Sequence, residues 1–91
     1  MHESGLIRNL VRKVEDLAGA EGAKKVVSVR VKFGPLSPIS PEHFLEHFDR
    51  ETKGTLAEGA RLEAEVTTDL SDPLAQDVVL DSFEVEKEVN A

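Results

Sequence analysis

The chain has 91 residues, a formal net charge of −7, and no Cys, Trp or Tyr. This length predicts a single domain, residues 1–91, and the acidic balance excludes the basic footprint of a nucleic-acid-binding protein. Without Cys there is no disulfide framework, thiolate metal site or cysteine nucleophile. No apolar run reaches the length of a signal segment or a membrane span, so we expect a cytoplasmic protein with no membrane partner.

Residues 4–18 are predicted to form an amphipathic helix. Apolar side chains recur three and four positions apart, as one buried helical stripe requires. They are Leu6, Ile7, Leu10, Val11, Val14, Leu17 and Ala18. Ser4 is expected to cap the start of this helix, and Gly19 or Gly22 to end it.

Residues 26–33, VVSVRVKF, alternate in the way of a half-buried strand. The core face is expected to carry Val27, Val29, Val31 and Phe33, and the other face Ser28, Arg30 and Lys32. The following GPLSPISP contains three prolines and a glycine, which predicts a shaped loop. A second helix is then predicted to begin at Pro41 with Ser40 as its cap and to stop at Gly54. Its apolar edge is formed by Phe44, Leu45 and Phe48.

Two further strands are predicted after the second helix, at residues 60–67 and 78–89. In the first of them, the residues expected to face the core are Leu62, Ala64 and Val66. In the last strand the alternation changes phase, which a β-bulge near Asp81–Ser82 would reconcile. The turn-rich LSDPLAQD is expected to join these strands as a hairpin. The order αβαββ predicts an α+β fold, a two-layer structure with two helices on one face of a three-stranded sheet.

The opening Met1-His2-Glu3 is the first group that could carry chemistry. The amine of Met1, together with the amide nitrogen and imidazole Nδ1 of His2, can close adjacent five- and six-membered chelate rings. Nickel(II) and copper(II) accept such square-planar, nitrogen-rich sites, and Glu3 could supply the fourth donor. On these three residues alone, a start methionine followed by two ordinary polar residues is the more frequent explanation.

Two further groups of residues could also carry chemistry. His43 and His47 share a helix face at positions i and i+4 and could bind a divalent ion, with Glu46 near enough to assist. The more common explanation of this spacing is a pair of surface residues beside the apolar edge. The acids between Asp77 and Glu88 could do acid–base work, although alternating acids on a strand usually form a solvated face.

A resemblance to a known family runs along most of the chain. MHESGLIRNLVRKVEDLA resembles the start of the HypA/HybF family, the nickel metallochaperones of NiFe-hydrogenase maturation, which begin Met-His-Glu and continue directly into an amphipathic helix. Residues 27–33 and 34–42 are similar to the family's first strand and its G-x-L-S-x-[VI]-x-P-E pattern. TKGTLAEGARLE at 52–63 and SFEVE at 82–86 are similar to its path into the second strand and to its last strand.

The resemblance implies a nickel site at the amino terminus. Carried over by position, the ligands of Ni(II) would be Met1, His2 and Glu3, with His2 essential, and His43 and His47 remain the less favoured ligands. The resemblance also implies the NiFe-hydrogenase large-subunit precursor as acceptor, a nickel-delivery GTPase as a further partner, and no enzymatic activity.

The chain departs from the family in one large respect. Family members carry a zinc ribbon with two CxxC pairs between the second and third strands, whereas this chain has no Cys and only a short connection at about 69–77. We therefore expect no structural zinc. The strand edge left exposed by the missing module could pair with a second copy to form a homodimer.

Three functions stay open at this point. The first is a nickel metallochaperone, in which His2→Ala abolishes nickel binding. The second is a metal-free adaptor that keeps the fold and docks on hydrogenase maturation proteins. The third is a small metal-dependent hydrolase built on His43, Glu46 and His47, in which His47→Ala abolishes zinc binding and His2→Ala has no effect.

Overall fold

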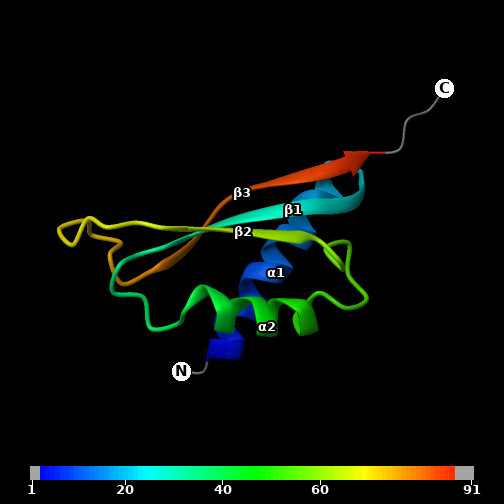
Figure 1. Cartoon of the computed structure of the whole chain (residues 1–91). Coiled ribbons are helices and arrows are strands. Elements are labelled where there is room, and N and C mark those ends of the chain that lie inside the picture. The colour runs from blue at the N-terminus through cyan, green and yellow to red at the C-terminus, as the bar shows by residue number, and fades with distance from the viewer. Residues whose placement is uncertain (1–2, 88–91) are drawn as a thin grey trace.

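The computed structural model describes residues 3–87, so Met1 and His2 lie outside the described residues. Within this range, two helices and three strands follow one another in the order αβαββ (Figure 1). They are α1 (Glu3–Ala20), β1 (Ala23–Phe33), α2 (Pro41–Glu51), β2 (Arg61–Val66) and β3 (Val78–Lys87). The predicted α+β class and element order are confirmed. Neither helix of the described range is long and apolar enough to cross a membrane.

The sheet is mixed, and β1 is its central strand in the order β2-β1-β3. β2 lies parallel to β1 on one side, and β3 lies antiparallel to it on the other. The chain passes from β1 through α2 into β2, which is the usual way to join two parallel strands. The expected hairpin between the last two strands is therefore wrong, because β1 separates β2 from β3.

The predicted β-bulge in the last strand is confirmed. In the antiparallel register, Arg30 is opposite Ser82 and Val31 is opposite Leu80, so Asp81 is the extra residue on β3. The bulge changes which side chains face the helices, and it thereby accommodates the change of phase in the sequence.

A second register shift, between Val26 and Ser28 of β1, was not predicted. It places Val26 in the core with no exposed surface, whereas Val27 is 38% exposed. The expectation that Val27 faces the core is wrong, because the irregularity moves its neighbour into that position. Val29, Val31 and Phe33 are buried as predicted.

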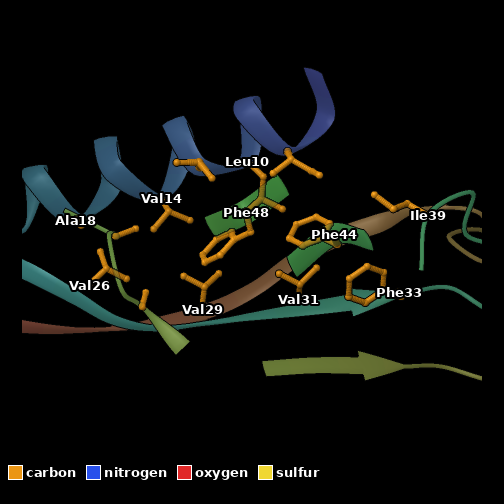
Figure 2. Close-up of a cluster of buried hydrophobic side chains, with 14 residues drawn as sticks. Leu10, Val14, Ala18, Val26, Val29, Val31, Phe33, Ile39, Phe44 and Phe48 are labelled. Atoms are coloured by element: carbon orange, nitrogen blue, oxygen red, sulfur yellow. The ribbon is translucent and has the colours of Figure 1, made fainter. Parts of the chain in front are cut away.

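Both helices cover the same face of the sheet, and the core lies between them and β1 (Figure 2). The ring of Phe44 meets that of Phe33 edge-on at 5.3 Å between centroids and stacks on that of Phe48 at 6.2 Å. The remaining buried residues of this cluster are Ile7, Leu10, Val11, Val14, Ala18, Val26, Val29, Val31, Ile39, Ala57 and Ala60. Burial of each large apolar side chain contributes about 1.5–3 kcal/mol.

The two helices begin and end for different local reasons. Ser4, the predicted cap position of α1, lies within the helix, which the structure describes from Glu3 onward, so that cap position is wrong. The chain leaves α1 through Gly22, whose φ of 73° is in the left-handed region that favours glycine. The predicted cap of α2 is confirmed, since Ser40 Oγ accepts a hydrogen bond from the His43 N–H at 3.2 Å.

Several residues expected inside the core lie at the surface. Leu17 of α1 and Leu45 of α2 are 43% and 42% exposed, because each sits at the edge of its helix stripe. Ala64 and Val66 of β2 are also exposed, and only Leu62 of this strand packs against the core. β2 is an edge strand of the sheet.

Residues 67–77 form the predicted turn-rich connection and lie at one end of the molecule (Figure 1). The connection folds back on the loop after β1. Gly34 N–H donates to the Asp77 carbonyl at 2.9 Å, and Leu36 N–H donates to the Ala75 carbonyl at 2.8 Å. A Cβ on residue 34 would overlap the carbonyl of Ala75, so this close approach requires glycine.

Candidate metal-binding residues

The amino-terminal candidate, Met1-His2-Glu3, is described by the structure at Glu3 alone. Glu3 is the first described residue of α1, and the other two members, Met1 and His2, lie outside the described residues. The first N–H groups of an α-helix have no carbonyl partner within the helix. Its positive end also favours anionic groups, such as a carboxylate or an amide that has lost its proton.

His43 and His47 lie together on the surface of α2, as their spacing predicts. Their ring centroids are 5.9 Å apart with the ring planes tilted by 41°. His43 is exposed and His47 is partly buried. Within residues 3–87, no group of three or more His, Asp or Glu side chains is arranged to hold a metal ion, so the pair has no third protein ligand there.

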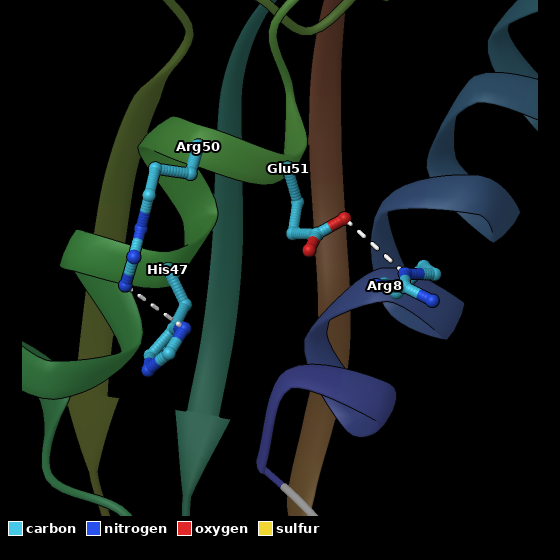
Figure 3. Close-up of polar contacts among 4 residues, drawn as sticks. All are labelled: Arg8, His47, Arg50 and Glu51. Atoms are coloured by element: carbon cyan, nitrogen blue, oxygen red, sulfur yellow. Dashed lines mark hydrogen bonds and ion pairs between the residues drawn. The ribbon is translucent and has the colours of Figure 1, made fainter.

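A basic side chain forms a hydrogen bond with one of the two imidazoles of this pair. Arg50 lies within 3.3 Å of His47, from Nη2 to Nδ1 (Figure 3). A guanidinium has only donors, so Nδ1 must accept and the proton of the neutral ring is on Nε2. In this arrangement neither ring nitrogen of His47 offers a free lone pair to a metal ion. Sequence reasoning did not consider Arg50, although its i+3 spacing from His47 indicates the contact.

The acids of β3 lie on the solvated face of the sheet. Those within the described residues, all exposed, are Asp81, Glu84 and Glu86, and Asp77, which precedes β3, is exposed as well. Asp81 pairs with Lys32 at 3.6 Å, and Glu65 of β2 pairs with Arg30 at 3.8 Å. These pairs cross from the outer strands to β1 and match the solvated face that alternating acids usually form. Glu88 lies outside the described residues.

An open groove of about 530 Å³ lies between the first half of α1 and the start of β3. Leu6, Leu10, Val78 and Leu80 are among its apolar lining residues, and Lys13 and Asp77 are its only charged ones. Its lining contains no histidine and no pair of acids, so it provides no side chains suited to acid–base catalysis. The sequence did not predict the groove, because it forms only when β3 lies beside α1.

Asp69, in the connection, has an unusual carboxyl group for an exposed residue. Its Oδ1 accepts hydrogen bonds from the hydroxyl of Ser71 at 2.6 Å and from the N–H of Ser71 at 2.9 Å. These two hydrogen bonds, the hydroxyl one first, lower the pKa of Asp69 below its ordinary value. The arrangement is a local turn of the chain and gathers no other ligand.

Comparison with known proteins identifies close sequence relatives. The family model described as "Hydrogenase/urease nickel incorporation, metallochaperone, hypA" matches residues 1–70. The "Hydrogenase maturation factor HypA" of Archaeoglobus fulgidus is 44% identical over 66 residues, covering 72% of this chain and 60% of the relative. That of Methylocella silvestris is 39% identical over 66 residues, covering 72% and 58%. The matched region thus spans about 60% of the length of these relatives.

Comparison with solved structures supports the fold. The "Solution structure of the Ni metallochaperone HypA from Helicobacter pylori" superposes with a TM-score of 0.81, covering 97% of this chain and all of that one, at 19% identity. A second, titled "Solution structure of HypA protein", gives a TM-score of 0.77 at 20% identity. At these identities the likeness shows a shared fold.

Proposed function

The chain belongs to the HypA family, and on that premise we propose that it is a nickel metallochaperone that binds Ni(II) at Met1-His2-Glu3 and assists NiFe-hydrogenase maturation. The family match begins at residue 1 and covers 70 of the 91 residues, including this opening. The family is one of metallochaperones and not of enzymes. With no Cys in the chain, a four-cysteine zinc site is absent.

Coordination chemistry explains why these residues suit nickel. The Met1 amine, the deprotonated amide nitrogen of His2 and its Nδ1 occupy three corners of a square plane, and Glu3 supplies the fourth donor. Ni(II) accepts this geometry, whereas zinc prefers a tetrahedron and magnesium an octahedron of oxygens. The nickel ion here is cargo, so a site at a chain end with few protein ligands suits its transfer to an acceptor.

The observation that carries the proposal is the family match, which begins at residue 1 and includes Met1-His2-Glu3. The structure describes α1 from Glu3 onward, so a helix follows Met1 and His2 in the sequence. The positive helix end favours both the loss of the His2 amide proton and the carboxylate of Glu3.

The partners follow from the family. We propose the large-subunit precursor of a NiFe-hydrogenase as the acceptor, with a nickel-delivery GTPase as a further partner. Residues 1–91 would form one nickel-binding domain in which the connection 67–77 stands where a zinc ribbon is inserted in the family. The lack of the cysteines of a zinc ribbon favours one alternative, a metal-free adaptor that docks on maturation proteins.

The test compares nickel binding by the unmodified chain, His2→Ala and His43→Ala, using absorption spectroscopy. The proposal predicts a square-planar nickel spectrum that His2→Ala abolishes and His43→Ala leaves unchanged. A chain that binds no nickel but co-purifies with a hydrogenase maturation protein would instead support the adaptor. A square-planar nickel spectrum that survives His2→Ala would contradict the amino-terminal site.

A further inference from the structure

We propose that His43 and His47 form a second, independent site for a divalent transition-metal ion on α2, and that Arg50 competes with the ion for His47. This site requires none of the three amino-terminal residues, so it stands or falls separately from the proposed function. It would take ions that accept imidazole ligands, such as Cu(II), Ni(II) and Zn(II).

The geometry of the two rings is close to what a shared ion needs. A metal about 2.1 Å from one nitrogen of each ring, at an angle near 100°, places the ring centroids about 5 Å apart. The observed 5.9 Å is slightly longer, and both side chains are accessible on the surface of the helix. Small side-chain rotations bring both nitrogens to one ion, and water completes its coordination.

The charges around the pair favour a cation. α2 carries four acids and a single basic residue, Arg50. Three of the acids, Glu42, Glu46 and Asp49, are exposed on the same two turns as the histidines. They supply long-range attraction that falls with ionic strength, while the histidines supply the ligand atoms.

Arg50 opposes the ion in two ways. Its hydrogen bond uses the lone pair of His47 Nδ1 and so places the ring proton on Nε2. A metal ion can bind Nε2 only if the ring proton moves to Nδ1, where it would face the guanidinium. A metal ion can bind Nδ1 only if it displaces the guanidinium from that nitrogen. Metal and Arg50 therefore exclude each other at His47, and the positive charge of Arg50 also repels the ion. Removing the charge alone is expected to tighten binding about three- to tenfold near physiological salt.

The experiment isolates this pair in the full chain. One glycine is added before Met1 to move the amine away from the chelate, and His2→Ala removes the only other histidine. Ni(II) alone is titrated by calorimetry and by NMR of the imidazole protons. Ni(II) held by two imidazoles and waters is octahedral and paramagnetic, so it broadens nearby ring signals, unlike a diamagnetic square-planar chelate.

The proposal predicts one bound ion that broadens the signals of His43 and His47 together. His43→Ala and His47→Ala should each weaken binding at least tenfold, and both keep a good helix former on the surface of α2. Arg50→Ala should tighten binding three- to tenfold. Lys24→Ala is the matched control, because it removes one positive charge from β1 and should leave the affinity unchanged.

Two results would overturn the proposal. Absent nickel binding, or binding of equal strength in either histidine variant, would exclude the site on α2. An Arg50→Ala affinity no tighter than that of Lys24→Ala would exclude the competition. Circular dichroism of each variant shows whether α2 remains folded, and nickel binding by the unmodified amino terminus bears on neither result.

Discussion

The helix-covered face of the sheet and the outer surface of the molecule place different demands on the sequence. In the interior, Phe33, Phe44 and Phe48 are almost completely buried, and within the described residues no buried side-chain nitrogen or oxygen lacks a hydrogen-bond partner. Of the candidate ligands that the structure describes, Glu3 lies in the first turn of α1, and His43 and His47 lie on the surface of α2. Stability and metal binding should therefore be separable, and substitutions in each region test this division.

The largest effect is expected in the interior. Phe44→Ala removes the ring that contacts both Phe33 and Phe48 and should lower the free energy of unfolding by about 3–5 kcal/mol. Leu45→Ala is the adjacent control, since Leu45 is 42% exposed and should cost less than about 1 kcal/mol. Urea denaturation measures both, and equal losses would contradict the assigned packing of α2.

The next largest effect on stability is expected where the connection 67–77 contacts the loop after β1. Gly34→Ala forces a Cβ against the carbonyl of Ala75 and should cost about 1–3 kcal/mol. It should also speed hydrogen exchange of the Leu36 N–H, which donates to Ala75. Gly19→Ala, in open space on α1, should instead stabilise the chain by about 0.5–1 kcal/mol. Destabilisation by both substitutions would count against the contact.

A smaller effect is expected at the start of α2. Ser40→Ala removes the acceptor of the His43 N–H and should cost about 1 kcal/mol. Ser40→Asp keeps an acceptor and should retain most of the stability. Thermal unfolding compares the two variants, and an Ala variant as stable as the Asp variant would show that Ser40 does not act as the cap.

The smallest effect concerns the exposed connection. Ser71→Ala removes the hydroxyl hydrogen bond and should raise the pKa of Asp69 toward its ordinary value. Because the folded pKa is lowered, the carboxylate stabilises the fold above its unfolded pKa, and this contribution is lost as pH falls through the folded pKa. NMR titration of the Asp69 carboxyl measures the change. Ser71→Thr keeps a hydroxyl, so a pKa raised equally in both variants would contradict this cause.

The strands were predictable from the sequence where the alternation of apolar and polar residues allowed only one arrangement. The bulge at Asp81 follows from apolar residues that change parity between Leu80 and Phe83. The shift in β1 left no such signal, since Val26 and Val27 are both apolar and either can fill the core position. Alternation also shows which residues share a face of a strand, but not whether a helix covers that face. It therefore predicts Val66 in the core, although this side chain is exposed.

The hairpin error has a different cause. The short connection before β3 suggested antiparallel neighbours, yet the path from β1 through α2 to β2 is typical of parallel strands and was the better signal. On the candidate ligands, helical spacing alone predicted that His43 and His47 lie together. It equally indicates the contact of Arg50 with His47. The proposed amino-terminal nickel site rests on family membership together with coordination chemistry, and not on any packing in the fold.

The most direct test of the central claim is nickel titration of the chain beside a version with one glycine added before Met1, by calorimetry and absorption spectroscopy. The extension moves the amine out of chelating position and leaves every side chain in place. The account predicts a square-planar nickel complex in the unextended chain and its loss in the extended one. The same complex in both chains, or in neither, would contradict an amino-terminal nickel site.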